Sequence, residues 1–173
     1  DVRGRHYRIE AQVRLNGPQD EGVLIAHGDA TSGYSLYLQG GHLVHDLNIG
    51  GVHQVLRSSR PVTAGHHVLG LQMQQGPLTT VQLPVGPPAQ VPAFRRATLL
   101  IDGEAVGTAE HPHGFNSLIS WSGLDIGLDR GSPVSHYEAP YTFTGQLRRV
   151  TVTLDPLGGP DAQAVAQAEL ARQ

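Results

Sequence analysis

Residues 33–49, Gly-Tyr-Ser-Leu-Tyr-Leu-Gln-Gly-Gly-His-Leu-Val-His-Asp-Leu-Asn-Ile, decide the fold. Over 34–39 apolar side chains alternate with more polar ones, so one side of an extended strand is apolar. Gly40 and Gly41 supply the positive φ angles of a two-residue turn, and a second run of similar length follows. A register slip of one residue would turn every apolar group toward water. The stretch therefore predicts a β-hairpin whose apolar face is covered by a second sheet.

Further strands are predicted on both sides of this hairpin. Residues 6–15 alternate apolar with charged or polar side chains, and 23–26 form a continuous apolar run that suits a strand covered on both sides. Over 66–73 the alternation places the adjacent His66 and His67 on opposite faces.

A second hairpin is predicted over 98–108, because Asp102-Gly103 between apolar runs is a strong hairpin signal. The remaining predicted strands are 54–58, 117–121, 124–128 and 143–154. In the last of these the alternation slips at Arg148-Arg149, which indicates a bulge.

Two segments depart from the strand pattern. The segment 74–97 is rich in proline, which removes amide donors, and we expect an extended insertion with at most one edge strand, at 79–83. A short helix over 162–172, with Asp161 as its N-cap, is the only helix expected. We predict an all-β antiparallel sandwich domain over 1–155, followed by a tail with a short helix over 156–173.

Composition limits the class of protein. The chain has 173 residues, of which 39% are hydrophobic, enough for one domain with a substantial core. The net charge is −3 and the cationic side chains are all Arg, scattered except for two adjacent pairs, which argues against a nucleic-acid-binding surface. Cysteine is absent, which excludes disulfides and thiolate sites but leaves the compartment open. No stretch approaches the length of a membrane span.

A series of short motifs occurs in a fixed order along the chain. They are Gly22-Val-Leu-Ile-Ala26, Gly33-Tyr-Ser-Leu-Tyr-Leu38, the return strand 43–48, Leu100-Ile-Asp-Gly103, Val106-Gly107, Asp125-Ile-Gly-Leu-Asp129, Gly131-Ser-Pro-Val134, Tyr137 and Pro140-Tyr-Thr-Phe-Thr-Gly145. The series resembles the C-terminal region of bacterial arylsulfatases, a concanavalin A/laminin G-like jelly roll. The succession 131–145 is its most specific part. The chain departs from this pattern at 72–96, and its tail at 161–173 resembles the tails of actinobacterial members.

The resemblance implies a sulfatase parent whose chemistry lies elsewhere. Members of that family use a formylglycine made from a Cys-x-Pro-x-Arg segment and a divalent cation, expected to be calcium. The present chain contains neither Cys nor Lys, so we expect no catalysis and no cofactor in it. Since the chain begins at Asp1 without Met or an apolar leader, we expect a fragment whose partner is the sulfatase catalytic domain of the same polypeptide.

Two sets of side chains are weak metal candidates. His111 and His113 lie on one side of an extended segment, but no third ligand is indicated nearby, and zinc sites use three or four. Calcium takes about six to eight oxygen ligands, which four aspartates could begin to supply, although they lack the spacing of a calcium loop. These aspartates are Asp29, Asp46, Asp125 and Asp129. Solvated or turn-forming side chains are the competing interpretation, and it is the favoured one.

Other side chains bear on glycan chemistry. Glycosidases with a similar sandwich carry paired carboxylates on one strand face, and Glu104 and Glu110 are too far apart in sequence to form such a pair. Four ring-bearing residues are candidates for a ligand or interface rim, with core packing as the competing interpretation. They are Trp121, His136, Tyr137 and Tyr141.

Three hypotheses of function follow. The leading one is a non-catalytic accessory domain of an arylsulfatase, which packs on the catalytic domain and shapes substrate access. The first alternative is a lectin-like module that binds carbohydrate, and the second is a structural or dimerisation unit.

Overall fold

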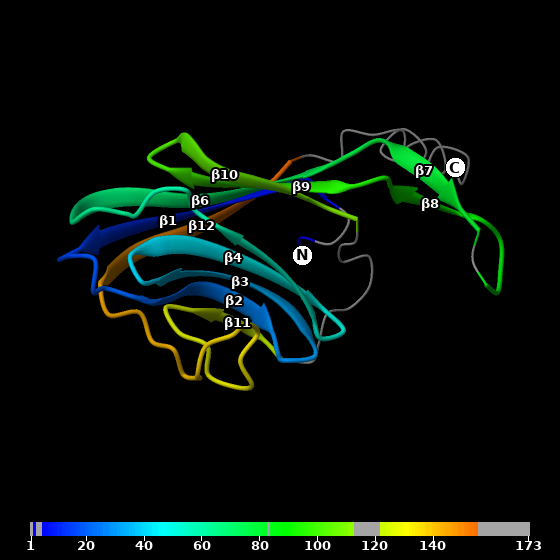
Figure 1. Ribbon diagram of the computed structural model, residues 1–173. Coiled ribbons are helices and arrows are strands. Elements are labelled where there is room, and N and C mark those ends of the chain that lie inside the picture. The colour runs from blue at the N-terminus through cyan, green and yellow to red at the C-terminus, as the bar shows by residue number, and fades with distance from the viewer. Residues whose placement is uncertain (1, 3–4, 83, 113–121, 156–173) are drawn as a thin grey trace, which may run out of the picture.

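Two five-stranded antiparallel sheets pack face to face in the computed structural model, which describes residues 2, 5–82, 84–112 and 122–155 (Figure 1). The strands are β1 (Tyr7–Leu15), β2 (Gly22–Gly28), β3 (Ser32–Gln39), β4 (His42–Ile49), β5 (Val52–Arg57), β6 (Gly65–Gln75), β7 (Leu78–Val81), β8 (Ala89–Pro92), β9 (Arg95–Ile101), β10 (Glu104–His111), β11 (Leu124–Ile126) and β12 (Gln146–Leu154). The first sheet has the order β10-β9-β6-β1-β12 and the second β11-β2-β3-β4-β5. The predicted all-β sandwich is confirmed.

The core lies between the two sheets. Along each strand every second side chain points to the same face of the sheet, and the core is built from the side chains that point inward. The largest fully buried members include Ile9, Leu24, Leu36, Leu38, Leu43, Leu47, Leu69, Leu71, Leu99 and Ile101. The outward positions of β1 and β6 include Gln12, Arg14 and His66, which are exposed. His67, on the opposite side of β6 from His66, has an 11% exposed side chain, as the alternation predicted.

The central hairpin forms as predicted, with Gln39 opposite His42 in the β3–β4 ladder. Gly40 and Gly41 have φ of 55° and 76°, the left-handed region that a two-residue hairpin turn requires. The expectation of a single covered face was wrong. Ser35 and Tyr37, on the side away from the core, are 0% and 3% exposed.

A loop over residues 128–141, here called the cover loop, accounts for this second buried face. Together with the second sheet it forms a small separate cluster of Val23, Ala26, Tyr37, Val44, Val134 and Tyr137, against which Tyr141 packs. In Figure 1 this loop, drawn in yellow and orange, lies on the outer side of the second sheet. The second sheet is therefore sandwiched between the main core and the cover loop.

The second predicted hairpin is β9–β10, with Asp102 at a φ of 53° in its turn. The predicted bulge in the last strand is also present: Gln12 pairs with Arg149 and Val13 with Leu147, so Arg148 is the extra residue. That strand starts at Gln146 rather than at 143. The amides of residues 143 and 144 bond instead to the carbonyls of residues 127 and 21.

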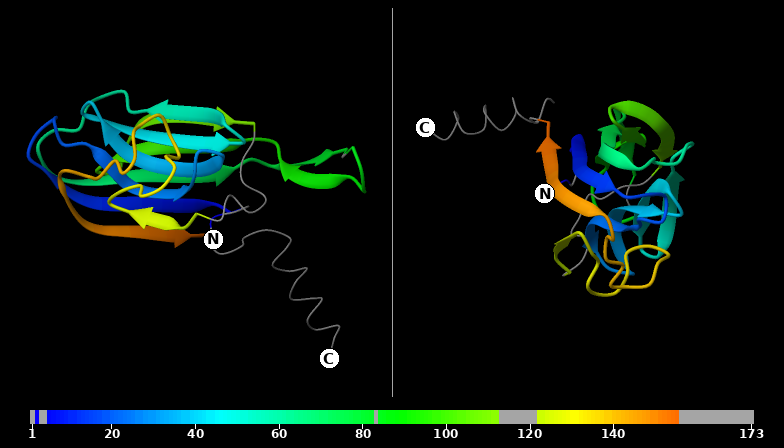
Figure 2. Two further views of the ribbon diagram at one scale, coloured as in Figure 1. Left: turned by 90° about the horizontal axis from the view of Figure 1, so that it is seen from below. Right: turned by 90° about the vertical axis from the view of Figure 1, so that its left-hand side faces the viewer.

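The proline-rich segment is more ordered than expected. It holds a complete hairpin, β7–β8, which follows β6 and precedes β9 in the chain and extends away from one end of the sandwich (Figure 2). Pro84, Pro87 and Pro88 lie between its two strands and Pro92 ends the second, so none of them interrupts the ladder. The prediction of at most one strand here was wrong for this reason.

The predicted strand 117–121 and the predicted helix 162–172 lie outside the described residues, and the division of the chain at 155 stays a prediction. Within the described part, no helix is long and apolar enough to cross a membrane.

Candidate functional site

A polar network joins the cover loop to the outer face of β4. In this strand Leu43 and Leu47 point to the core, so the alternation sends Val44, Asp46 and Asn48 to the opposite face. Asp46 is completely buried there. A buried carboxylate needs partners, because an unpaired charge in the interior is costly.

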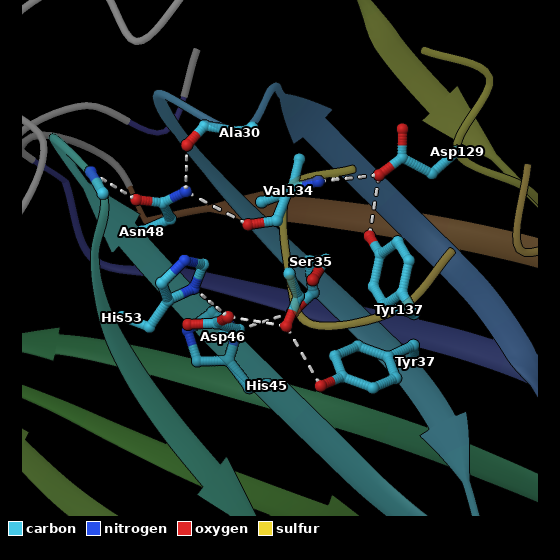
Figure 3. A network of polar contacts seen from close by, with 12 residues as sticks. Ala30, Ser35, Tyr37, His45, Asp46, Asn48, His53, Asp129, Val134 and Tyr137 are labelled. Atoms are coloured by element: carbon cyan, nitrogen blue, oxygen red, sulfur yellow. Dashed lines mark hydrogen bonds and ion pairs between the residues drawn. The ribbon is translucent and has the colours of Figure 1, made fainter. Parts of the chain in front are cut away.

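Asp46 is the centre of this network (Figure 3). Its Oδ2 atom lies 2.6 Å from His53 Nδ1 on β5 and accepts a 2.6 Å hydrogen bond from the Ser135 hydroxyl of the cover loop. The Tyr37 hydroxyl lies 3.1 Å from Ser135 Oγ and extends the chain of contacts. The other carboxylate oxygen, Oδ1, has no hydrogen-bond partner among the described residues.

Asp129 organises the cover loop itself. Its Oδ2 accepts hydrogen bonds from the Tyr137 hydroxyl at 2.7 Å and from the Val134 amide at 3.1 Å. Burial, together with the bond to Asp129, raises the pKa of Tyr137 well above its ordinary value. Tyr137 also stacks on Tyr141, with 5.0 Å between ring centroids. These contacts hold the loop in one conformation against the sheet.

Asn48 fixes the rim of the same face. Its amide donates to the carbonyls of Ala30 and Val134, and its side-chain oxygen accepts from the Gly51 amide. One buried side chain thereby ties together the β2–β3 turn, the β4–β5 turn and the cover loop (Figure 3). The rim is thus a pre-organised surface rather than a set of independent loops.

Two imidazoles lie at this rim, next to Asp46. The ring of exposed His136 lies 4.0 Å from that of half-buried His53, centroid to centroid. Ligand atoms of Asp46, His53 and His136 all lie within 4.8 Å of one another. Residue types and mutual distances both suit a metal ion.

The ring-bearing residues predicted for a rim have different surroundings. Tyr137 is 8% exposed and Tyr141 is half-buried, with its hydroxyl on the Leu38 carbonyl, so both take part in packing. His136 is exposed and lies at the rim described above. Trp121 lies outside the described residues.

Among the described residues, the predicted metal candidates do not form a group with one another, and only Asp46 belongs to the cluster with His53 and His136. Asp125 accepts three hydrogen bonds from Arg130, whose guanidinium holds the pKa of that carboxyl below its usual range. Asp129 accepts the hydrogen bond from Tyr137 within the cover loop. His111 lies at the end of β10, where burial lowers its pKa. His113 lies outside the described residues.

A second feature is an open groove of about 200 Å³ on the outer face of the first sheet. It lies across β1, β6 and β12 near the β9–β10 turn, and its lining residues are Gln12, Val13, His66, His67, Val68, Asp102 and Arg148. The bulge at Arg148 provides one wall. The side chains of Gln12, His66 and Arg148 make no hydrogen bond or ion pair with the described part of the chain.

One end of the groove is held by Asp102. Its carboxylate accepts a hydrogen bond from the Val68 amide at 2.8 Å and lies 2.7 Å from His67 Nδ1. Burial raises the pKa of Asp102, but these hydrogen bonds outweigh it and the pKa lies below its ordinary value. The turn and β6 are therefore fixed to each other beside the groove.

A third titratable group lies in the core. His45 alternates with Leu43 and Leu47 on the inner face of β4 and is 0% exposed. Its Nδ1 lies 3.0 Å from the Ser35 carbonyl, while Nε2 has no hydrogen-bond partner in residues 2, 5–82, 84–112 and 122–155. Burial lowers the pKa of His45 to about 4, because the charged form would be desolvated.

The two glutamates considered for catalysis serve as surface ion-pair partners. Glu104 binds Arg60 at 2.7 Å and Glu110 binds Arg96, at opposite ends of β10. They do not form the carboxylate pair of a glycosidase.

The fold of this chain is similar to that of several proteins of known structure. No family model matches the chain, and no curated protein does. Solved structures do match. The Ruminococcus gnavus IT-sialidase CBM40 bound to α2,3-sialyllactose has a TM-score of 0.61 and 17% identity, covering 93% of this chain and 82% of that one. Domains LG4-5 of the mouse laminin α1 chain have a TM-score of 0.59 and 16% identity, covering 90% of this chain and 38% of that one.

A heptameric SAP-like pentraxin from Limulus polyphemus is also similar, with a TM-score of 0.51, 14% identity and coverage of 86% and 63%. The chain thus spans about two fifths of the laminin structure. At such identities the likeness shows the fold alone, and it confirms the predicted concanavalin A/laminin G-like jelly roll. None of these three structures is a sulfatase domain.

Proposed function

We propose that this chain is a non-catalytic, lectin-like module and that the groove on the first sheet binds an acidic sugar. The observation that carries the proposal is the guanidinium of Arg148, which lies at a bulge beside the side chains of Gln12 and His66. None of the three side chains has a hydrogen-bond or ion-pair partner among the described residues. The likeness to a carbohydrate-binding module bound to sialyllactose supports it.

The groove has the chemistry that an acidic sugar needs. A guanidinium binds a carboxylate through two parallel hydrogen bonds, which no neutral sugar can accept in the same way. Gln12 and His66 offer donors and an acceptor for ring hydroxyls, and Val68, 36% exposed, offers an apolar contact. The groove is smaller than the pockets of about 300–1,000 Å³ that enclose drug-sized ligands, so it suits a single terminal sugar.

Isothermal titration calorimetry of the full chain tests the proposal, with α2,3-sialyllactose as ligand and lactose as its uncharged control. We expect binding of sialyllactose alone. Arg148→Ala should weaken it at least tenfold, since a hydrogen bond to a charged group contributes about 1.5–3 kcal/mol. Arg149→Ala is the matched control: the same charge is removed one residue away, outside the groove lining. Equal losses in the two variants, or no binding at millimolar sugar, would refute the proposal.

The accessory role in an arylsulfatase remains a separate hypothesis, supported by the ordered motif series between residues 22 and 145. It predicts that a longer gene product encodes a Cys-x-Pro-x-Arg segment upstream of Asp1. A complete coding sequence without that segment would remove the hypothesis and leave the glycan proposal unaffected.

A further inference from the structure

We propose that Asp46, His53 and His136 form a binding site for a divalent transition metal, with Zn²⁺ as the best-fitting ion. The three side chains come from β4, β5 and the cover loop, and their ligand atoms lie within 4.8 Å of one another. Without an ion, His53 Nδ1 and Asp46 Oδ2 are in direct hydrogen-bond contact at 2.6 Å, a contact that a bound ion would replace. The two imidazole rings are tilted by 38° with centroids 4.0 Å apart.

The unpartnered oxygen of Asp46 is the independent sign of a missing ligand. Asp46 is 0% exposed, and within the part of the chain that the structure describes its Oδ1 has no hydrogen-bond partner. A buried carboxylate oxygen without a partner carries a desolvation cost that nearly all proteins avoid. A cation shared with His53 and His136 would remove that cost. Figure 3 shows the carboxylate facing the ring of His53.

The donor set selects the kind of ion. Calcium takes about six to eight oxygen ligands, and two imidazoles with one carboxylate do not supply them. Zn²⁺ binds His nitrogen and Asp oxygen, and sites with three protein ligands leave a fourth position open for water or another group. Because His136 is exposed, an ion could reach these ligands from solvent.

The surrounding contacts fit a metal site as well. Metal-binding carboxylates are held in orientation by hydrogen bonds from outside the ligand set. Here the Ser135 hydroxyl donates to Asp46 and in turn contacts the Tyr37 hydroxyl. Asn48 ties the β4–β5 turn to the cover loop through the Val134 carbonyl. These contacts therefore fix the β4–β5 turn and the cover loop, which carries His136, relative to each other without the ion.

Metal uptake by the full chain, stripped beforehand with a chelator, tests this site without any sugar. We expect calorimetry with Zn²⁺ to find one tight equivalent per chain. The exposed His136 can be changed without disturbing the core, and His136→Gln should weaken the affinity at least tenfold, as should His53→Gln. His6→Gln, at an exposed position just before β1 and outside both proposed sites, is the control and should bind like the parent chain.

A second readout ties the ion to these ligands. The visible absorption of the Co²⁺-loaded chain should change in the His136→Gln variant and stay unchanged in His6→Gln. Circular dichroism confirms that each variant is folded. The absence of a tight equivalent in the parent chain, or equal affinities in His136→Gln and His6→Gln, would overturn the proposal.

Discussion

Replacement of buried His45 should flatten the pH dependence of stability. In the folded protein, burial lowers the pKa of this side chain from its ordinary value of 6.5 to about 4. As pH falls through 6.5, this side chain binds a proton in the unfolded chain but not in the folded chain. The free energy of unfolding therefore falls until about pH 4 and then levels off. A difference of about 2.5 units corresponds to about 3 kcal/mol, most of it lost by about pH 4.5.

The test compares the parent chain with His45→Leu, which has a similar volume and cannot be charged. Urea unfolding followed by circular dichroism at pH 7, 5.5 and 4.5 gives the free energy of unfolding. The lost bond to the Ser35 carbonyl lowers stability equally at every pH, so it cancels in the slope. The depressed pKa of His111 acts in the same direction and is present in both chains. Equal losses between pH 7 and 4.5 in both chains would refute the reasoning.

Two further changes test the cover loop and the central turn. Asp129→Ala leaves the Tyr137 hydroxyl and the Val134 amide without their acceptor. We expect the free energy of unfolding in urea to fall by about 2–4 kcal/mol. As a control, Glu110→Ala removes an exposed ion pair and should lower it by less than about 1 kcal/mol. Gly41→Ala places a side chain at a φ of 76° with no atom closer than 3.6 Å, so backbone strain alone should cost about 1–2 kcal/mol; an unchanged melting temperature would contradict the turn geometry.

Local turn chemistry explains why the sequence predicted much of the sandwich. Gly40-Gly41 and Asp102-Gly103 each join two apolar runs, and both hairpins form with the predicted turn residues. The bulge at Arg148 was also predictable, because one extra residue shifts the alternation by one. These signals act over a few residues and need no knowledge of the rest of the fold.

The cover loop was not predictable in the same way. Ser35 alternates with apolar neighbours and therefore indicates a solvent-facing position, yet it is buried by a segment about a hundred residues later. The loop has no periodicity, and its conformation depends on single bonds, such as that from Tyr137 to Asp129. For this reason the sequence predicted Tyr137 at a ligand or interface rim, although its side chain is buried between the cover loop and the second sheet.

The proposed metal site had one usable signal in the sequence. Gly50-Gly51 is a turn of the same kind as Gly40-Gly41, and a two-residue turn there pairs Asn48 with His53. This register places His53 on the same face as Asp46. The approach of His136 depends on the cover loop and could be known only from the structure.

The most direct test of the central claim is a map of where an acidic sugar binds. Backbone amide shifts of the isotope-labelled full chain are followed by NMR during titration with α2,3-sialyllactose. The account predicts that the largest changes fall on Gln12, His66, Val68 and Arg148, around the groove. Changes centred on Asn48 and the cover loop, or none at all, would contradict it.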